Sequence, residues 1–196
     1  MIWGMGTGRC GTKSLARVLD GVHEPMPWIR DEAIRSMYGD QVALAQVREK
    51  IRQRLEMDVK AVVDLKHAFV ITTIMELDPD PEFVWVTREP VATVQSFLSG
   101  GSWTARNQYG RDLWRPWNGW QNMESRIEKA VAHWLAVNHI CMNQFHAFPN
   151  TRMMLCDELE VRLNVYDDRK ALNKEQILFV EHRCGDLWRE ILGLRR

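Results

Sequence analysis

Short apolar runs alternate with longer helical patterns along this chain, and that alternation limits the possible folds more than any other feature. Four of the runs have the length of buried strands. They are Met1–Met5, Ala61–Leu65, Phe83–Val86 and Met153–Cys156. Strands that are apolar throughout and separated by helices are typical of a parallel sheet covered on both faces. The sequence therefore predicts an α/β fold with a central parallel sheet flanked by helices on both faces.

Helical patterns fill the segments between these runs. Prolines keep residues 22–27 extended or turning, and residues 31–57 form a long charged stretch that is expected to break at Tyr38-Gly39-Asp40. A first helix is expected to begin at Thr12 and end at Asp20-Gly21. Further helices are expected at 68–77, 90–98, 123–148 and 174–192, with a long irregular loop at 99–122. We found no repeat or linker, so residues 1–196 are expected to form a single domain.

The bulk composition excludes several classes of protein. Lys plus Arg and Asp plus Glu both number 26, so no overall field attracts nucleic acid or an anionic membrane. Four widely spaced cysteines suggest neither a zinc site nor a redox dithiol. No apolar run has the length of a signal peptide core or a membrane helix. The expectation is a cytoplasmic protein with free thiols, without a nucleic-acid or membrane partner.

A glycine-rich turn at residues 6–14 separates the first strand from the first helix. Such a turn directs backbone N–H groups at one point, near the positive end of the helix dipole. Arg9, Lys13 and the hydroxyls of Thr7, Thr12 and Ser14 add donors at the same place. This order of strand, glycine loop and helix predicts a phosphate site in a P-loop-like nucleotide-binding fold.

The loop departs from the nucleoside triphosphatase pattern G-x-x-x-x-G-K-[ST]. Gly6 and Gly11 have the required separation, but Thr12 stands where that pattern needs lysine, and Lys13 comes one residue late. One residue along a helix is a rotation of about 100°, so Lys13 is not a simple substitute. The departure disfavours a kinase without excluding one.

Residues 8–15 instead resemble the 5′-phosphosulfate loop of sulfotransferases, which commonly reads Lys/Arg-Ser-Gly-Thr-Thr. Arg9 matches the basic residue, whereas Cys10 replaces the usual serine and Lys13 the second threonine. Each of these two replacements removes a hydroxyl donor.

A second motif, at residues 83–96, makes the resemblance more specific. In sulfotransferases a buried strand ends in arginine, a serine follows eight residues later, and both hold the 3′-phosphate of the donor. Arg88 and Ser96 have that spacing. Arg88 ends a strand, where open α/β sheets bind ligands, and its planar guanidinium suits phosphate oxygens. The expected donor-binding residues are Gly8, Arg9, Cys10, Gly11, Thr12, Lys13, Ser14, Arg88 and Ser96.

Weaker features of the second half of the chain agree with the same family. Trp134 and Asn138 on the expected long helix, and residues 152–159 after it, resemble the family's "W…N" helix and "yEdL" strand end. The last helix, with Cys184, resembles its closing helix.

The resemblance offers two candidates for the catalytic base. Glu24 resembles the glutamate that follows the first helix in carbohydrate and tyrosyl-protein sulfotransferases, where it is a base or binds the acceptor. His67 resembles the base of the Lys-Thr-His motif of cytosolic sulfotransferases, with Lys66 as a sulfate contact. Here Lys66 and His67 are adjacent, and neighbours on a strand face opposite ways. Arg9 is the expected positive charge beside the transferred group.

The expected loop at 99–122 interleaves aromatic and basic residues. Trp103, Tyr109 and Trp114 are candidates for holding a phenol or sugar acceptor. An aromatic cover packed on the core is an equally good interpretation. Single-stranded nucleic acid also binds such patterns, but the balanced charge argues against it.

Together these features indicate an enzyme that transfers a sulfuryl group from 3′-phosphoadenosine 5′-phosphosulfate to a hydroxyl, or an amine, of a small phenolic or carbohydrate acceptor. The product would be adenosine 3′,5′-bisphosphate, and the reaction would need no metal. One alternative is a small-molecule kinase, which would need Mg²⁺ and a strand-end carboxylate such as Asp64. Another is a nucleotide-binding module without catalysis.

Overall fold

The computed structural model describes residues 1–99, 123, 125–159 and 171–194. Its five strands form one parallel sheet in the order β2-β3-β1-β4-β5. The strands are β1 (Ile2–Gly6), β2 (Val22–His23), β3 (Ala61–Val63), β4 (Glu82–Thr87) and β5 (Thr151–Leu155). This arrangement confirms the predicted α/β fold and is consistent with a P-loop-like topology. The two-residue strand β2 was expected only as an extended segment.

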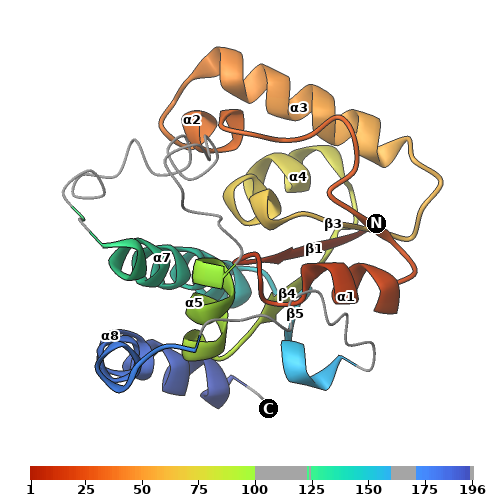
Figure 1. Cartoon of the computed structure of the whole chain (residues 1–196). Helices are drawn as coiled ribbons and strands as arrows, with labels where there is room; N and C mark the ends of the chain where they lie inside the picture. The colour runs from red at the N-terminus through yellow and green to blue at the C-terminus, as the bar shows by residue number, and fades with distance from the viewer. Residues whose placement is uncertain (100–122, 124, 160–170, 195–196) are drawn as a thin grey trace.

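Helices cover the sheet, and most begin close to where the sequence pattern places them. In Figure 1, α2, α3 and α4 lie together at the top and α5, α7 and α8 at the bottom. The α-helices are α1 (Thr12–Val18), α2 (Glu32–Met37), α3 (Gln41–Leu55), α4 (Ile71–Leu77), α5 (Pro90–Ser99), α7 (Arg126–Ala147) and α8 (Lys174–Gly193). Two short 3₁₀ helices are η1 (Leu65–Phe69) and η3 (Cys156–Glu158).

The predicted break in the charged stretch separates α2 from α3. Gly39 has φ 87°, and the Asp40 carboxylate accepts a hydrogen bond from the Ala43 N–H at 3.0 Å. Asp40 is thus the N-cap of α3. The predicted loop at 99–122 lies outside the described residues except for Ser99, which belongs to α5.

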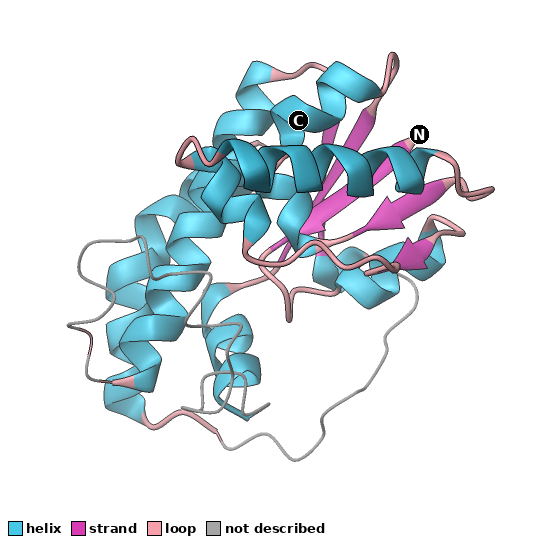
Figure 2. Ribbon diagram, turned by 90° about the horizontal axis from the view of Figure 1, so that it is seen from above, coloured by secondary structure: helices cyan, strands magenta, loops and turns pink. Residues whose placement is uncertain are grey.

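The central strands bury both faces, and their side chains alternate between two cores. Trp3 and Met5 of β1 join Trp85 of β4 in the larger core, which includes residues of α3, α4, α7 and α8. Val84 and Val86 of β4 face the other way and pack with residues of α1. Figure 2 shows the strands fanned out side by side with helices over them. Across the described part of the chain, no helix is both long and apolar enough to cross a membrane.

Gly6, the last residue of β1, sits where no side chain fits. A Cβ atom there would lie 2.5 Å from the carbonyl oxygen of Val86 and 2.7 Å from the Cys10 sulfur. At Gly6, β1 therefore lies so close to β4 and to the glycine loop that follows β1 that only glycine fits.

Two glycine-to-alanine substitutions should change stability in opposite directions. Gly6→Ala should lower the free energy of unfolding by about 1–3 kcal/mol, because the methyl group overlaps backbone. Gly185→Ala should raise it by about 0.5–1 kcal/mol, because Gly185 lies inside α8 with only the end of the Arg189 side chain near its Cβ position. Urea denaturation measures both. Equal effects of the two variants would contradict this account of the β1–β4 contact.

Candidate functional site

Four strands deliver their predicted site residues to one edge of the sheet. Gly6 of β1 lies opposite Val86 of β4, so the glycine loop and Arg88 leave neighbouring strands side by side. On the other side of β1, Gly4 lies opposite Val63 of β3, and His23 of β2 also pairs with Val63. Because the strands are parallel, residues 7–14, 24, 64–67 and 88 all follow carboxyl ends, where such sheets bind ligands.

The glycine loop has an unusual backbone. Gly8, Arg9 and Gly11 have φ angles of 74°, 52° and 97°, in the left-handed region that costs energy for any residue with a side chain. Gly11 is the N-cap of α1, and no side chain caps the helix there. Left-handed residues held in a loop before a helix are typical of anion-binding turns.

The loop side chains divide between site and core. The Cys10 thiol is fully buried, and burial raises its pKa to about 11. It lies beneath Gly6 in the smaller core, so Cys10 has only its backbone to offer a nucleotide. Thr12 and Ser14 are buried, whereas Lys13 is exposed. The Thr12 hydroxyl lies 3.1 Å from Nε2 of His23.

Two helices hold the loop from behind. His133 of α7 donates from Nε2 to the Thr7 carbonyl at 2.6 Å. Its ring meets that of Phe97 of α5 edge-on, with 5.0 Å between centroids. A Cβ atom on Gly8 would lie 4.0 Å from the Phe97 ring. Since Ser96 precedes Phe97, the helix that carries Ser96 contacts the glycine loop.

Arg88 follows β4 with its backbone fixed by α7. The indole N–H of Trp134 donates to the Arg88 carbonyl at 3.2 Å, and the Thr87 hydroxyl donates to Oδ1 of Asn138 at 2.9 Å. The motif residues Trp134 and Asn138 thus position the strand end. Nε of Arg88 is buried and has no hydrogen-bond partner within the described part of the chain. A buried donor without a partner needs an explanation, which makes Arg88 a candidate for donating to an acceptor atom of a ligand.

The helix after Arg88 begins with a side-chain cap. The carboxylate of Glu89 accepts from the N–H groups of Val91 and Ala92, both at 2.7 Å. Ser96 lies six residues into α5 from Pro90 and is 4% exposed.

Glu24 occupies a strained position immediately after β2. Its φ is 45°, and its N–H donates to the Val63 carbonyl at 2.8 Å. The carboxylate lies 3.9 Å from Nζ of Lys66, and its side chain is 37% exposed. A non-glycine residue held in this conformation is often functional.

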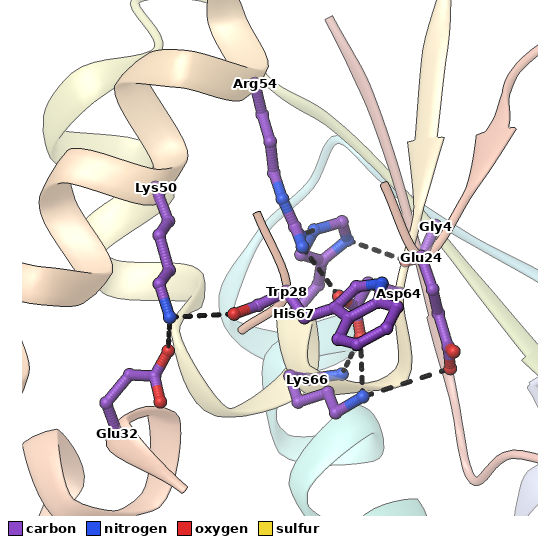
Figure 3. Close-up of polar contacts among 9 residues, drawn as sticks. All are labelled: Gly4, Glu24, Trp28, Glu32, Lys50, Arg54, Asp64, Lys66 and His67. Carbon is purple, nitrogen blue, oxygen red and sulfur yellow. Dashed lines mark hydrogen bonds and ion pairs between the residues drawn. The ribbon is translucent and has the colours of Figure 1, made fainter. Parts of the chain in front are cut away.

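Lys66 and Arg54 share the buried carboxylate of Asp64 (Figure 3). Nζ of Lys66 lies 3.5 Å from Oδ1 of Asp64, and Nη2 of Arg54 donates to Oδ2 at 2.8 Å. Burial acts to raise the pKa of Asp64, but the charges of Lys66 and Arg54 and the hydrogen bond from the Lys66 N–H outweigh it, and the net pKa is lowered. Both oxygens are therefore engaged, and Asp64 is not available as the Mg²⁺ ligand that a kinase would need.

His67 has a structural position rather than the expected catalytic one. It is fully buried; Nδ1 donates to the Gly4 carbonyl at 2.8 Å, and Nε2 accepts from Arg54 at 2.6 Å. Burial, and then the charge of Arg54, lower its pKa to about 3. Because both ring nitrogens are hydrogen-bonded and the side chain is fully buried, His67 is not placed to take a proton from an acceptor.

The sequence did not point to three residues that shape this edge: His23, Arg54 and His133. Arg54 is fully buried although it lies in the charged stretch, and nothing in that stretch distinguishes it. His133 and His23 become visible only through their partners, the loop carbonyl and Thr12. The acceptor candidates Trp103, Tyr109 and Trp114 lie outside the described residues.

The buried histidines should make stability fall in acid. Burial lowers the pKa of His133 to about 4, whereas an unfolded histidine titrates near about 6.5. Below that pH the unfolded chain binds more protons, so each such histidine lowers the free energy of unfolding by up to about 1.4 kcal/mol per pH unit. When the free energy of unfolding is measured by denaturation at pH 7, 6 and 5, it should fall less steeply with decreasing pH in His133→Gln than in the parent protein. His182→Gln, on the exposed side of α8, should keep the full slope; equal slopes for all three would contradict the assignment.

Comparison with known proteins identifies no relative. No family model, curated protein or solved structure matches this chain.

Proposed function

We propose that this chain binds 3′-phosphoadenosine 5′-phosphosulfate and transfers its sulfuryl group to a hydroxyl, or an amine, of a small phenolic or carbohydrate acceptor. The observation that carries the proposal is the buried Nε of Arg88, which lacks a hydrogen-bond partner in the described part of the chain. Arg88 directly follows β4, the strand that pairs with β1 next to the glycine loop. A ligand phosphate there would satisfy a donor that is otherwise costly to bury.

Two cation-bearing positions at one edge suit a nucleotide with two anionic ends. The loop of residues 8–14 would hold the 5′-phosphosulfate with its backbone N–H groups and Arg9, and Arg88 with Ser96 would hold the 3′-phosphate. β1 and β4 are neighbours in the sheet, and hydrogen-bonded strands lie about 4.8 Å apart. The two positions are therefore close enough for one adenosine bisphosphate to reach both.

The donor supplies a sulfur atom that the acceptor oxygen attacks while the bond from sulfur to the 5′-phosphate oxygen breaks. Glu24 would take the acceptor's proton, since its carboxylate is partly exposed at the same edge. Lys66, 3.9 Å from that carboxylate, would offset the negative charge on the transferred group together with Arg9. In this scheme His67 supports the strand end and takes no part in proton transfer.

Two alternative functions, a kinase and a binding module without catalysis, make different demands on the site. A kinase would need a free strand-end carboxylate for Mg²⁺, and Asp64 is occupied by Arg54 and Lys66. A binding module without catalysis would bind the bisphosphate but would neither hydrolyse the donor nor transfer its sulfuryl group.

All four cysteines are free thiols, which suits action in the cytoplasm.

Calorimetry with adenosine 3′,5′-bisphosphate, and with ATP plus Mg²⁺, separates these functions. Metal-independent binding of the bisphosphate supports the sulfotransferase, whereas binding of ATP alone supports the kinase. Bisphosphate binding without donor hydrolysis or transfer to a phenol and sugar panel supports the module.

Arg88→Ala should weaken bisphosphate binding by more than about 1 kcal/mol, the loss expected for a charged hydrogen bond. An analogue without the 3′-phosphate should bind the parent and the variant alike. Arg152→Ala is a matched control, because Arg152 lies exposed on β5 beside Glu82. Equal losses for both nucleotides would refute the role given to Arg88.

Glu24→Gln should retain bisphosphate affinity and lose turnover at saturating donor by a factor of about 10²–10⁴, the usual contribution of a general base. The amide keeps the shape of the side chain but cannot take the proton. Glu82→Gln, at the exposed start of β4, serves as the control. Full turnover in Glu24→Gln would remove Glu24 as the base.

A further inference from the structure

The segment between β2 and α2 presents aromatic and apolar surface next to Glu24. Pro25 and Ile29 are buried, whereas Met26 is 67% exposed and Trp28 48% exposed. Buried residues thus anchor both ends of a short stretch whose other side chains face solvent. Large exposed side chains on a chain segment that is fixed in place are typical of a contact surface.

Trp28 is held through its backbone by a partly buried ion pair. Nζ of Lys50 on α3 donates to the Trp28 carbonyl at 2.7 Å and also pairs with the carboxylate of Glu32 on α2. The Glu32 side chain is only 6% exposed, and burying a charge is costly unless it is paired. The two helices therefore fix the backbone that carries the indole.

The indole points away from this anchor and toward the candidate site. In Figure 3 the Trp28 side chain extends from the Lys50 side toward Asp64 and Lys66. Lys66 forms ion pairs with both Asp64 and Glu24. Trp28 lies four positions after Glu24 in the chain, which limits the distance between their Cα atoms to about 14 Å. The guanidinium of Arg30 lies over one face of the indole, 5.2 Å from its centroid, in a cation–π contact.

We propose that Trp28, with Arg30 beside it, is a subsite for the ring of the acceptor, either a phenol or a pyranose. A half-exposed indole binds a flat apolar ring face, and a neighbouring guanidinium can donate to the hydroxyls or anionic substituents at the ring's edge. A ring bound there extends its hydroxyl toward the carboxylate of Glu24. This inference rests on the proposed function and assigns the residues that hold the acceptor ring at that same site.

The experiment observes the indole directly, so that it does not depend on turnover. The tryptophan indoles are labelled with ¹⁵N, and the Trp28 signal is identified by its loss in Trp28→Phe. The protein is then titrated with 4-nitrophenol, methyl β-glucopyranoside or 1-propanol, each with and without adenosine 3′,5′-bisphosphate. We expect at least one ring compound to shift the Trp28 signal to saturation, and propanol to leave it unchanged.

Variants test whether the ring contact contributes to affinity. Trp28→Ala should weaken binding of that ring compound at least tenfold by calorimetry, and Trp28→Phe, which keeps an aromatic face, less than threefold. Tyr38→Ala removes another exposed aromatic ring, at the end of α2, and should leave the affinity unchanged. A Trp28 signal that no ring compound moves, or unchanged affinity in Trp28→Ala, overturns the subsite.

Bisphosphate binding separates failure of the subsite from failure of the proposed function. If the bisphosphate binds and neither ring compound shifts the Trp28 signal, the subsite is wrong and the nucleotide site stands. If ring compounds shift the signal and depend on Trp28 while the bisphosphate does not bind, the subsite stands and the donor assignment is wrong.

Discussion

The parallel pairing of β1 with both β3 and β4 is the constraint on which the rest of the structure depends. It buries β1 on both faces, which requires apolar side chains above and below and allows only glycine where β1 meets β4 at Gly6. It also sends every connection out at the same edge, so that residues far apart in sequence become neighbours. The polar side chains at this edge lie close together because the strands run in the same direction, not because these side chains attract one another.

A buried charge cluster stabilises that edge at some cost. Asp64, Arg54 and His67 are removed from water, and each would be destabilising alone. They are tolerated because the carboxylate meets Arg54 and Lys66, and the imidazole joins Arg54 to the Gly4 carbonyl of β1. The cluster also links α3 to the first strand, so this helix is tied to the sheet.

The features that depend on neighbouring residues could be predicted from the sequence. The alternation of elements, the glycine-rich turn between the first strand and the first helix, and the place of Arg88 after a buried strand all depend on neighbours in sequence. The side chains of Cys10 and His67 could not be predicted, because their directions depend on contacts with Gly6 and Arg54 that only the folded chain creates. The 3₁₀ turn η1 starts directly after Asp64, so the alternation of a strand no longer applied to Lys66 and His67. β2, two residues long, is too short for any periodicity to show.

Helix α7 reaches both halves of the candidate nucleotide site through two consecutive residues. His133 binds the carbonyl of Thr7 in the loop after β1, and Trp134 binds the carbonyl of Arg88 after β4. The helix therefore fixes the spacing between the loop after β1 and the end of β4. If the proposed nucleotide binds there, this spacing would favour a ligand whose anionic ends lie the same distance apart, and a nucleotide with a different separation would contact only one of the two positions.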